Sequence, residues 1–340
     1  MTTAVLICPG RGSYTRSELG TLTSQFGDAD LLAAFDGHRA GLGQETLTAL
    51  DTAPRFSAQR HTRGDNASAL IYAAALGDRM ALRDDIEIVA VTGNSMGWYS
   101  ALACAGALAP MDGFVLANTM GTLMQETLVG GQVLYPHMAE DWRFDPSRKA
   151  ELLALVDRID NGPGQTLSLS IDLGGMLVLA GNEAGLVAFE AAVPRNAGYP
   201  LRLDNHAAFH SPLMVPIAEQ AKAMLPQDPF GQPTIPLVDG RGAIWWPDAS
   251  DTRSLWEYTL GHQVTQTYDF THTIVTAARE FAPDVFILTG PGGGLGGAVA
   301  QALITARWRG MTCKADFQSL QSDRPVLVSM GRQDDRAKVV

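Results

Sequence analysis

The stretch VAVTGNSMGWYS, residues 89–100, decides the fold of this chain. An apolar, β-branched run leads into Gly-x-Ser-x-Gly, and a helical pattern follows from Trp98 to Leu108. This order predicts a strand, a sharp turn and a helix, with Ser95 at a strained corner and its hydroxyl exposed above a sheet. Gly93 and Gly97 let the backbones of strand and helix approach without a clash at Cβ.

Ser95 has the surroundings that a nucleophile needs. The N-terminus of the following helix offers free N–H groups and a positive dipole end, which suit an oxyanion forming at an attacked carbonyl. The motif alone would also fit a glycine-rich turn with an ordinary solvated serine. The prediction that Ser95 is a nucleophile therefore depends on the flanking strand and helix, and on a partner base.

Composition and charge exclude several classes of function. The chain has 340 residues, of which 46% are hydrophobic and 18% charged, so it can bury a large core and is globular. Its net charge of −11 argues against a nucleic-acid partner, because phosphate binding needs a basic surface. Cys8, Cys104 and Cys313 are widely spaced without a CxxC pair, so we expect no zinc or other metal site.

Targeting signals are not visible in the sequence. Residues 1–7 begin directly as a strand, without the basic and apolar regions of a signal segment. The longest apolar stretch, residues 101–111, is too short to span a bilayer. Together with the unpaired cysteines, which fit a reducing compartment, these features lead us to expect a cytoplasmic protein that does not bind membranes.

The N-terminal part alternates strands and helices. Residues 5–8 predict a buried strand that ends in the loop Pro-Gly-Arg-Gly-Ser at 9–13, which fits neither GxGxxG nor a P-loop. The loop either lines an active site or is a tight turn without function. Residues 66–82 predict a buried helix capped by Asp65 or Asn66, and residues 112–124 predict another helix, interrupted by Gly121.

The pattern of predicted strands and helices changes at about residue 131. The pattern predicts strands at 132–138, 166–173, 176–180 and 199–203, with helices at 146–159 and 183–193 between them. Strand, helix, strand, strand, helix, strand is the ferredoxin-like order. We therefore predict a small subdomain, residues 131–203, inserted into a large one.

After residue 203 the chain returns to the pattern of its N-terminal part. Helices are predicted at 212–224, 254–261 and 271–281, and strands at 235–238 and 285–289, the last leading into Gly-Pro-Gly. Residues 1–130 and 204–320 are thus predicted to form one discontinuous large subdomain. The remaining residues, 321–340, are charged near their end and are expected to form a loose C-terminal tail.

A nucleophilic serine needs a base, and the sequence offers two candidates close together. His210 lies just after the last strand of the insertion and before a helix, in a loop that joins the two subdomains. That position suits a base facing the cleft between them. His206, four residues earlier, is its main rival.

Several ordered motifs resemble one family. GNSMG at 93–97 with its helix resembles the nucleophile elbow of malonyl-CoA:acyl carrier protein transacylases and polyketide-synthase acyltransferase domains. PGRGS at 9–13 resembles their first loop, AFHSPLM at 208–214 their catalytic-histidine motif, GPG at 290–292 their late turn, and MQE at 124–126 the helix before their small subdomain. The matches cover about residues 4–305. The resemblance implies an α/β fold, with an α/β-hydrolase-like large subdomain and a ferredoxin-like insert.

The resemblance also implies a mechanism. Ser95, activated by His210, would take an acyl group from acyl-CoA and pass it to the phosphopantetheine thiol of an acyl carrier protein in fatty acid or polyketide biosynthesis. The backbone N–H groups of Met96 and Arg11 would stabilise the oxyanion. A backbone carbonyl usually orients the histidine in this family, and Gln263 lies in a plausible region. Acyl-CoA is then a substrate, no cofactor is bound, and we expect a monomer.

Departures from the family pattern bear on the acyl group. The position that resembles the carboxylate-binding arginine of malonyl-specific members holds Met120. A methionine cannot pair with a carboxylate, so an uncharged acyl group is favoured over malonyl. The guanidinium of Arg11 would replace the lost arginine if its side chain turned into the pocket. Asn94 and Trp98 also depart from the pattern, and with Met120 and Phe209 they are the predicted substrate-binding residues.

Two other functions use the same residues. An acyl-thioester hydrolase with the same Ser95–His210 pair would use water as acceptor, and the Met120 change does not separate it from a transferase. A binding protein with a decayed site is disfavoured, because the serine, the histidine and the oxyanion glycines are all present. The choice between transfer and hydrolysis depends on how well the pocket excludes water.

Overall fold

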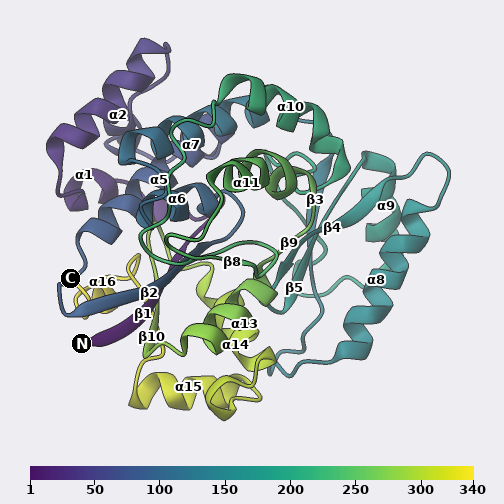
Figure 1. Ribbon diagram of the computed structural model, residues 1–340. Coiled ribbons are helices and arrows are strands. Elements are labelled where there is room, and N and C mark those ends of the chain that lie inside the picture. Colours follow the sequence, from purple (N-terminus) through teal and green to yellow (C-terminus); the bar gives the residue numbers. More distant parts are fainter.

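The computed structural model describes residues 1–340, and a six-stranded sheet lies at its centre (Figure 1). The strand order is β11-β10-β1-β2-β7-β8, parallel except for the last pair. The strands are β1 (Thr2–Cys8), β2 (Ile86–Gly93), β7 (Leu237–Val238), β8 (Ile244–Trp245), β10 (Val285–Leu288) and β11 (Leu327–Ser329). Because β1 lies between two parallel neighbours and under helices, its residues 4–8 are all fully buried, which explains its unbroken apolar run.

Helices pack around this sheet. The N-terminal group contains α1 (Thr21–Gln25), α2 (Ala29–Gly41), α3 (Leu47–Asp51), α4 (Ala58–His61), α5 (Gly64–Met80), α6 (Gly97–Cys104) and α7 (Pro110–Glu126). The C-terminal group contains α10 (Val215–Met224), α11 (Thr252–Glu257), α12 (Gln263–Thr265), α13 (Phe270–Phe281), α14 (Gly296–Thr305), α15 (Lys314–Asp323) and α16 (Gln333–Arg336). Short 3₁₀ turns are η1 (Arg16–Glu18), η2 (Pro212–Met214) and η4 (Trp308–Gly310), and η3 (Tyr258–His262) is a π-helix.

Helix α7 corrects the prediction of an interruption at Gly121, because it runs unbroken through that residue. A Cβ on Gly121 would come within 2.5 Å of the carbonyl oxygen of Gly64 on α5, and a Cβ on Gly64 would meet Gly121 at 2.7 Å. The glycine therefore serves a close helix–helix contact and not a break. The predicted cap of α5 is also wrong: Arg63 is the cap residue, and the Asn66 side chain accepts a hydrogen bond from Arg39 instead.

The second sheet has the strand order β6-β3-β5-β4-β9. Its strands are β3 (Gly131–Pro136), β4 (Leu167–Leu173), β5 (Met176–Gly181), β6 (Leu201–Arg202) and β9 (Tyr268–Asp269), with α8 (Pro146–Asp160) and α9 (Glu183–Ala192) beside them (Figure 1). The first four strands pair antiparallel in ferredoxin-like order, which confirms the predicted fold class. A separate core of ten buried residues, including Tyr135 packed edge-on against Phe189, lies between this sheet and its helices.

Strand β9 joins the two halves of the molecule. It comes from residues 268–269, outside the segment predicted as the insert, and pairs parallel to β4 at Ile171 and Asp172. Two residues are too few to show a strand pattern in a sequence, so this pairing was not predicted. It ties the smaller sheet to the segment that also carries Gln263.

The C-terminal residues correct the prediction of a loose tail. Leu327–Ser329 form β11 at the edge of the main sheet, and Val339 is buried. Arg336 forms an ion pair with the buried carboxylate of Asp78, which also accepts a hydrogen bond from the N–H of Gly290 at 2.5 Å. The charges near the chain end looked like a solvated tail, but one of them neutralises a buried acid.

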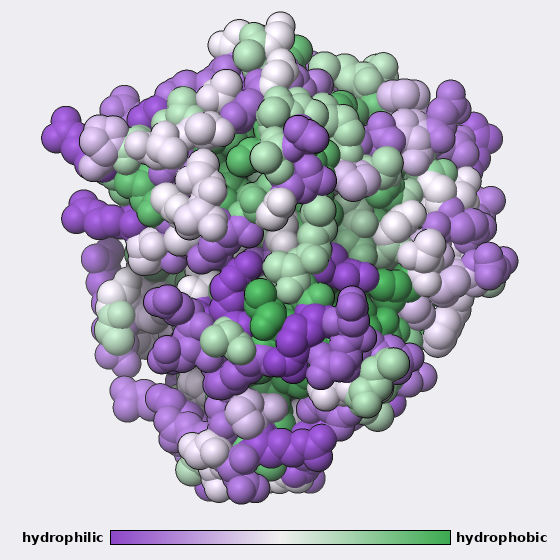
Figure 2. All heavy atoms as spheres, turned by 90° about the vertical axis from the view of Figure 1, so that its left-hand side faces the viewer, coloured by the Kyte–Doolittle hydropathy of each residue, from purple (hydrophilic) through white to green (hydrophobic).

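One face of the molecule is seen in Figure 2. Hydrophilic residues cover its periphery and most of its lower half, and apolar residues gather mainly in a band from the top to the centre. Single apolar side chains at a surface are ordinary for a globular protein. None of the helices is both long and apolar enough to cross a membrane.

Candidate active site

The elbow around Ser95 has the geometry that its glycines predict. Strand β2 ends at Gly93, α6 begins at Gly97, and Ser95 between them has a φ of +56°. A Cβ on Gly93 would lie 2.2 Å from the carbonyl oxygen of Gly97, and a Cβ on Gly97 would lie 2.1 Å from that of Cys8. Only glycine fits either position, so the turn is held tight and lies close to the end of β1.

The structure brings Ser95 and His210 together across 115 residues of sequence. The Oγ of Ser95 lies 2.7 Å from Nε2 of His210, within hydrogen-bond distance. His210 is buried and has a φ of +54°, so both members of the pair occupy the left-handed region that non-glycine residues rarely adopt. Strain of this kind persists only where the surroundings over-determine the backbone, as they do in functional sites.

Main-chain carbonyls hold the histidine. Nδ1 of His210 lies 2.6 Å from the carbonyl oxygen of Gln263, and the backbone N–H of His210 donates to the carbonyl of Val264 at 3.1 Å. A carbonyl only accepts, so Nδ1 carries the proton and Nε2 is left to accept from the serine hydroxyl. Burial lowers the pKa of His210 to about 4, against a smaller opposing effect of the Gln263 bond, so the ring is a neutral base at pH 7.

His206, the rival base, points elsewhere. Its Nδ1 lies 2.8 Å from Oε1 of Gln132, and burial lowers its pKa to about 3. Gln132 also donates to Ser170, whose hydroxyl donates to the carbonyl of Phe209 at 2.7 Å. His206 thus belongs to a polar cluster that supports the loop carrying His210.

Two backbone donors face the same cleft as the serine. The N–H groups of Met96 and Arg11 donate no hydrogen bond within the protein, and both residues line the cleft with Ser95. A Cβ on Gly10 would lie 2.5 Å from the carbonyl oxygen of Asn94, so a glycine there lets the first loop approach the elbow. Free N–H groups beside a nucleophile can stabilise an oxyanion, as the sequence predicts for these two residues.

The cleft at Ser95 encloses about 390 Å³, including the part open to solvent. Its walls come from α5, the elbow, α7, the His210 loop and α12. The residues are Arg11, Ser68, Ser95, Met96, Tyr99, Met120, Gly121, Met124, Phe209, His210, Gln263 and Val264. The dyad therefore lies in a concave, mostly apolar site of the kind that binds small molecules.

Known proteins resemble this chain both in sequence and in structure. No protein-family model matches the chain. The malonyl CoA-acyl carrier protein transacylase of Bacillus subtilis is 28% identical over 209 residues, which cover 61% of this chain and 62% of that protein. The phenolphthiocerol synthesis polyketide synthase type I Pks15/1 of Mycobacterium marinum is 27% identical over 241 residues, 71% of this chain but only 10% of the synthase.

The solved structures agree with these relatives. The crystal structure of the malonyl-CoA:ACP transacylase of Synechocystis sp. PCC 6803 covers all of both chains with a TM-score of 0.74 at 21% identity. Homologues and structural neighbours of this chain are malonyl-CoA:acyl carrier protein transacylases and polyketide-synthase acyltransferase domains. The resemblance stated from the sequence is thereby confirmed, and at this identity the match to the Synechocystis transacylase shows a shared fold.

Within the transacylase fold, the structure separates the predicted substrate-binding residues into two groups. Met120, 1% exposed, and Phe209, 5% exposed, line the cleft. Asn94 and Trp98 do not. The Trp98 indole is buried behind α6, donates to Thr259 at 2.9 Å and packs edge-on against Tyr258. The indole of Trp98 points from α6 into the core, which corrects that prediction, and Asn94 is not among the residues that line the cleft.

Sequence reasoning missed two tyrosines that support the elbow. The hydroxyl of Tyr268 donates to the carbonyl of Gly93 at 2.6 Å, and its ring centroid lies 5.5 Å from that of His210. The hydroxyl of Tyr99 donates to Oε1 of Gln263 at 3.2 Å, and Nε2 of the same glutamine donates to the carbonyl of Ser95 at 2.9 Å. Gln263 thus positions both the serine turn and, through its main chain, the histidine. No motif signals either tyrosine.

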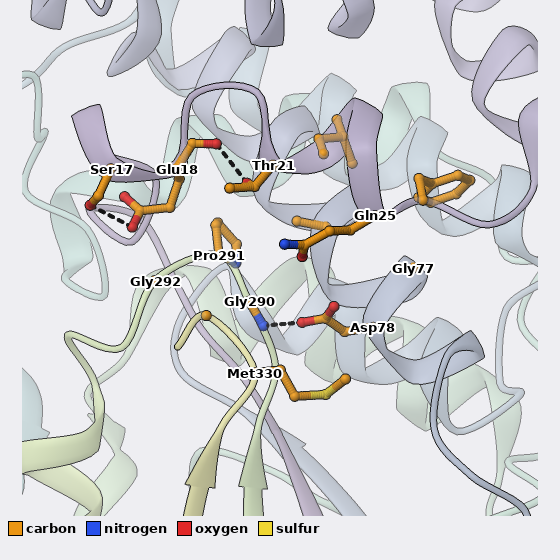
Figure 3. A pocket seen from close by; sticks show the side chains of 14 residues that line it. Ser17, Glu18, Thr21, Gln25, Gly77, Asp78, Gly290, Pro291, Gly292 and Met330 are labelled. Atoms are coloured by element: carbon orange, nitrogen blue, oxygen red, sulfur yellow. Dashed lines mark hydrogen bonds between the residues drawn. The ribbon is translucent and has the colours of Figure 1, made fainter. Parts of the chain in front are cut away.

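A second hollow, seen in Figure 3, lies beside the Gly-Pro-Gly turn. Its polar walls include Ser17, Glu18 and Asp78, and Ser17 donates to Glu18 at 2.7 Å. Asp78 bonds Gly290 and Arg336 there, as described above. Ser17 is exposed and its neighbour is a carboxylate, and no histidine lines this hollow, so the cleft at Ser95 is the stronger candidate for a nucleophilic site. No group of three His, Cys, Asp or Glu residues is arranged to hold a metal ion.

Proposed function

We propose that this chain is an acyltransferase that moves an acyl group from coenzyme A to an acyl carrier protein through an acyl-Ser95 intermediate. The observation that carries the proposal is the 2.7 Å approach of Ser95 Oγ to a histidine nitrogen whose partner nitrogen is fixed on a main-chain carbonyl. Serine nucleophile, base and orienting group are the parts of nucleophilic acyl transfer. Gln263 supplies the third part through its backbone.

The first half-reaction forms the acyl-enzyme. Nε2 of His210 takes the Ser95 proton as Oγ bonds to the thioester carbonyl carbon. The N–H groups of Met96 and Arg11 stabilise the oxyanion of the tetrahedral intermediate. The carbon–sulfur bond then breaks, and the coenzyme A thiolate leaves with the proton held by His210. The products are the Ser95 ester and free coenzyme A thiol.

The second half-reaction reverses these steps with another thiol. His210 takes the proton of the phosphopantetheine thiol, the sulfur attacks the ester carbonyl, and the carbon–oxygen bond breaks. The proton returns to Oγ of Ser95. A carrier protein as acceptor is supported by the name of the Bacillus relative, a malonyl CoA-acyl carrier protein transacylase. We place the reaction in fatty acid or polyketide synthesis on the same ground and on the match to a polyketide synthase.

The acyl group is the finer part of the proposal. Met120 occupies the position at which the resemblance expects an arginine, and with Met124 and Val264 it gives the cleft an apolar wall. Such a wall accommodates an alkyl chain, which favours the uncharged acyl group predicted from the sequence. That prediction assumes that no other cation reaches the cleft, and Arg11 lines it.

Intact-protein mass spectrometry tests the reaction. The protein is incubated with acetyl-, butyryl-, malonyl- and succinyl-CoA, and any acyl-enzyme is then mixed with a holo acyl carrier protein. We expect a mass increase that Ser95→Ala abolishes, followed by transfer of the added mass to the carrier. An adduct that disappears at the same rate in buffer alone would show the acyl-thioester hydrolase instead. No adduct with any donor would refute the proposed nucleophile.

A further inference from the structure

Tyr268 contacts both the serine turn and the histidine. Its hydroxyl donates to the carbonyl of Gly93 at 2.6 Å, in the turn that carries Ser95. Its ring centroid lies 5.5 Å from that of His210, with the two ring planes at 55°. The side chain is 1% exposed and is not among the residues that line the cleft. Any effect of Tyr268 on a reaction in the cleft must therefore pass through Ser95 and His210.

The ring of Tyr268 is held from two sides. Strand β9, which carries it, pairs with β4 at Ile171 in the smaller sheet (Figure 1). On the other side the ring packs on Gly240, which follows β7 of the main sheet, and a Cβ there would come within 2.5 Å of it. The N–H of Asp269 also donates to the carbonyl of Gly240, at 2.7 Å. The ring is thus fixed relative to both sheets.

The hydroxyl of Tyr268 supports a strained turn. Burial raises the pKa of Tyr268 well above its usual value, so the phenol keeps its proton at pH 7 and donates to the Gly93 carbonyl. Ser95 has a φ of +56° and His210 a φ of +54°. Such backbone keeps its conformation only where the surroundings over-determine it. The hydroxyl supplies one constraint on the elbow, and the ring supplies another against the imidazole.

One short segment links the serine turn to the histidine. Ser95 and His210 are 115 residues apart in sequence, so their 2.7 Å contact depends on groups that touch both. Gln263 does so, with its side-chain amide on the carbonyl of Ser95 and its main-chain carbonyl at Nδ1 of His210. Tyr268 is a second such residue, on the same segment. Because this segment also contains β9, the smaller sheet is tied to the Ser95–His210 pair.

We propose that Tyr268 is a positioning residue for acyl transfer, which holds the Ser95 hydroxyl within reach of Nε2 of His210. The inference rests on the proposed acyl transfer at Ser95. A proton passes between these two atoms in each half-reaction, and proton transfer needs hydrogen-bond distance. A misplacement of about 1 Å costs about 100-fold in rate. Since Tyr268 does not line the cleft, its loss slows the reaction without weakening the binding of the acyl donor.

Tyr268→Phe removes the hydroxyl and keeps the ring, and Tyr72→Phe is the matched control. Tyr72 is also buried, and its hydroxyl donates to the carbonyl of Pro110 at 2.7 Å, away from the cleft. Each variant is first reacted with a fluorophosphonate, which labels an activated serine whatever its natural substrate. Single turnovers with acetyl-CoA and with malonyl-CoA then give the limiting acylation rate and the half-saturating donor concentration. Circular dichroism and urea unfolding show whether each variant is folded.

We expect Tyr268→Phe to lower the labelling rate and the limiting acylation rate about 10- to 100-fold, the range for a buried hydrogen bond left unmade. The half-saturating donor concentration should not change. Tyr72→Phe should lose comparable stability and keep both rates. A folded Tyr268→Phe protein with the parent's rates would overturn the inference, and so would equal rate losses in the two variants.

The two probes separate this inference from the proposed function. Labelling that depends on Tyr268, in a protein that no acyl-CoA acylates, would refute the proposed transfer and leave the positioning of Ser95 and His210 standing. A parent protein that is neither labelled nor acylated at Ser95 would overturn both.

Discussion

Acyl-enzyme formation should be nearly independent of pH down to about pH 5. The buried ring of His210 has a pKa lowered to about 4, against about 6.5 for a free histidine, and its neutral form is the base. At pH 5 about nine-tenths of such rings are neutral, whereas an ordinary histidine would retain only about 3% in that form. The two cases differ about 30-fold in the expected rate at pH 5, relative to the plateau at pH 8.

Single-turnover acylation, quenched at intervals and read by intact mass, measures this rate between pH 4.5 and pH 8. Two thioesters, acetyl-CoA and malonyl-CoA, separate the titration of the enzyme from that of the substrate carboxylate. A rate that already falls tenfold per pH unit below pH 6.5 with both donors would refute the argument. It would mean that His210 is hydrated in solution and that the buried, carbonyl-anchored ring is not the base that acts.

The same pKa shift affects folding. The folded pKa lies below the unfolded value, so between about pH 6.5 and pH 4 the unfolded state binds a proton that the folded state does not. Stability therefore falls as pH falls through this window, by about 2 kcal/mol at pH 5 for His210. Circular dichroism at each pH must show folded protein before a rate is interpreted.

Three further outcomes are expected. Gly97→Ala forces a Cβ to 2.1 Å from the carbonyl of Cys8 and should destabilise the fold by about 3 kcal/mol or prevent folding, whereas Gly37→Ala, in an open position on α2, should be neutral or stabilising in urea unfolding. Arg336→Gln leaves the carboxylate of Asp78 buried without its cation and should lower the free energy of unfolding by about 3–5 kcal/mol near pH 7. An unchanged urea midpoint would mean that this ion pair does not anchor the C-terminal residues. Gel filtration should give a monomer near 36.3 kDa, and an apparent mass of twice that value would contradict it.

The elbow could be predicted because its causes are local. An apolar strand, two glycines and a helix lie within twenty residues, and the clash that requires Gly93 arises with Gly97, four residues away. The clash that requires Gly97 arises with the carbonyl of Cys8 at the end of β1, and the sequence does not show that contact. The ferredoxin-like order was likewise readable, since each strand and helix of the insert carries its own period. The two-residue strands β8 and β9 carry no period, and the structure shows them only through their pairing.

The site itself was less readable, because its geometry comes from contacts across the chain. Sequence position did not distinguish His206 from His210; the carbonyl of Gln263 and the amide of Gln132 do so. Gln263 was named as a candidate for orienting the histidine, but it contacts His210 through its main-chain carbonyl. Any residue type supplies such a carbonyl, so the sequence could not single out this position. Trp98 was assigned to the substrate because it departs from the family pattern at that position, but the helix turns its indole into the core.

Arg11 and Met120 both line the cleft at Ser95, so either position can carry a cation there. If a cation at either position can bind the substrate carboxylate, a variant that moves the arginine from position 11 to position 120 should keep the preference between malonyl-CoA and acetyl-CoA. Where the parent protein acylates faster with malonyl-CoA than with acetyl-CoA, Arg11→Gln alone should lower that ratio about 10- to 100-fold. Adding Met120→Arg should restore at least part of the ratio, because the new guanidinium enters the same cleft from α7.

The control is Met120→Arg in the parent protein, which places two cations in one cleft and should lower stability through their repulsion. Restoration in the double variant, with the parent affinity for acetyl-CoA, would mean that charge in the cleft selects the donor whichever wall supplies it. A folded double variant without restored selectivity would mean that the carboxylate must lie against the first loop. The acyl chain would then have to extend from Ser95 toward the first loop, where Arg11 also offers its backbone N–H.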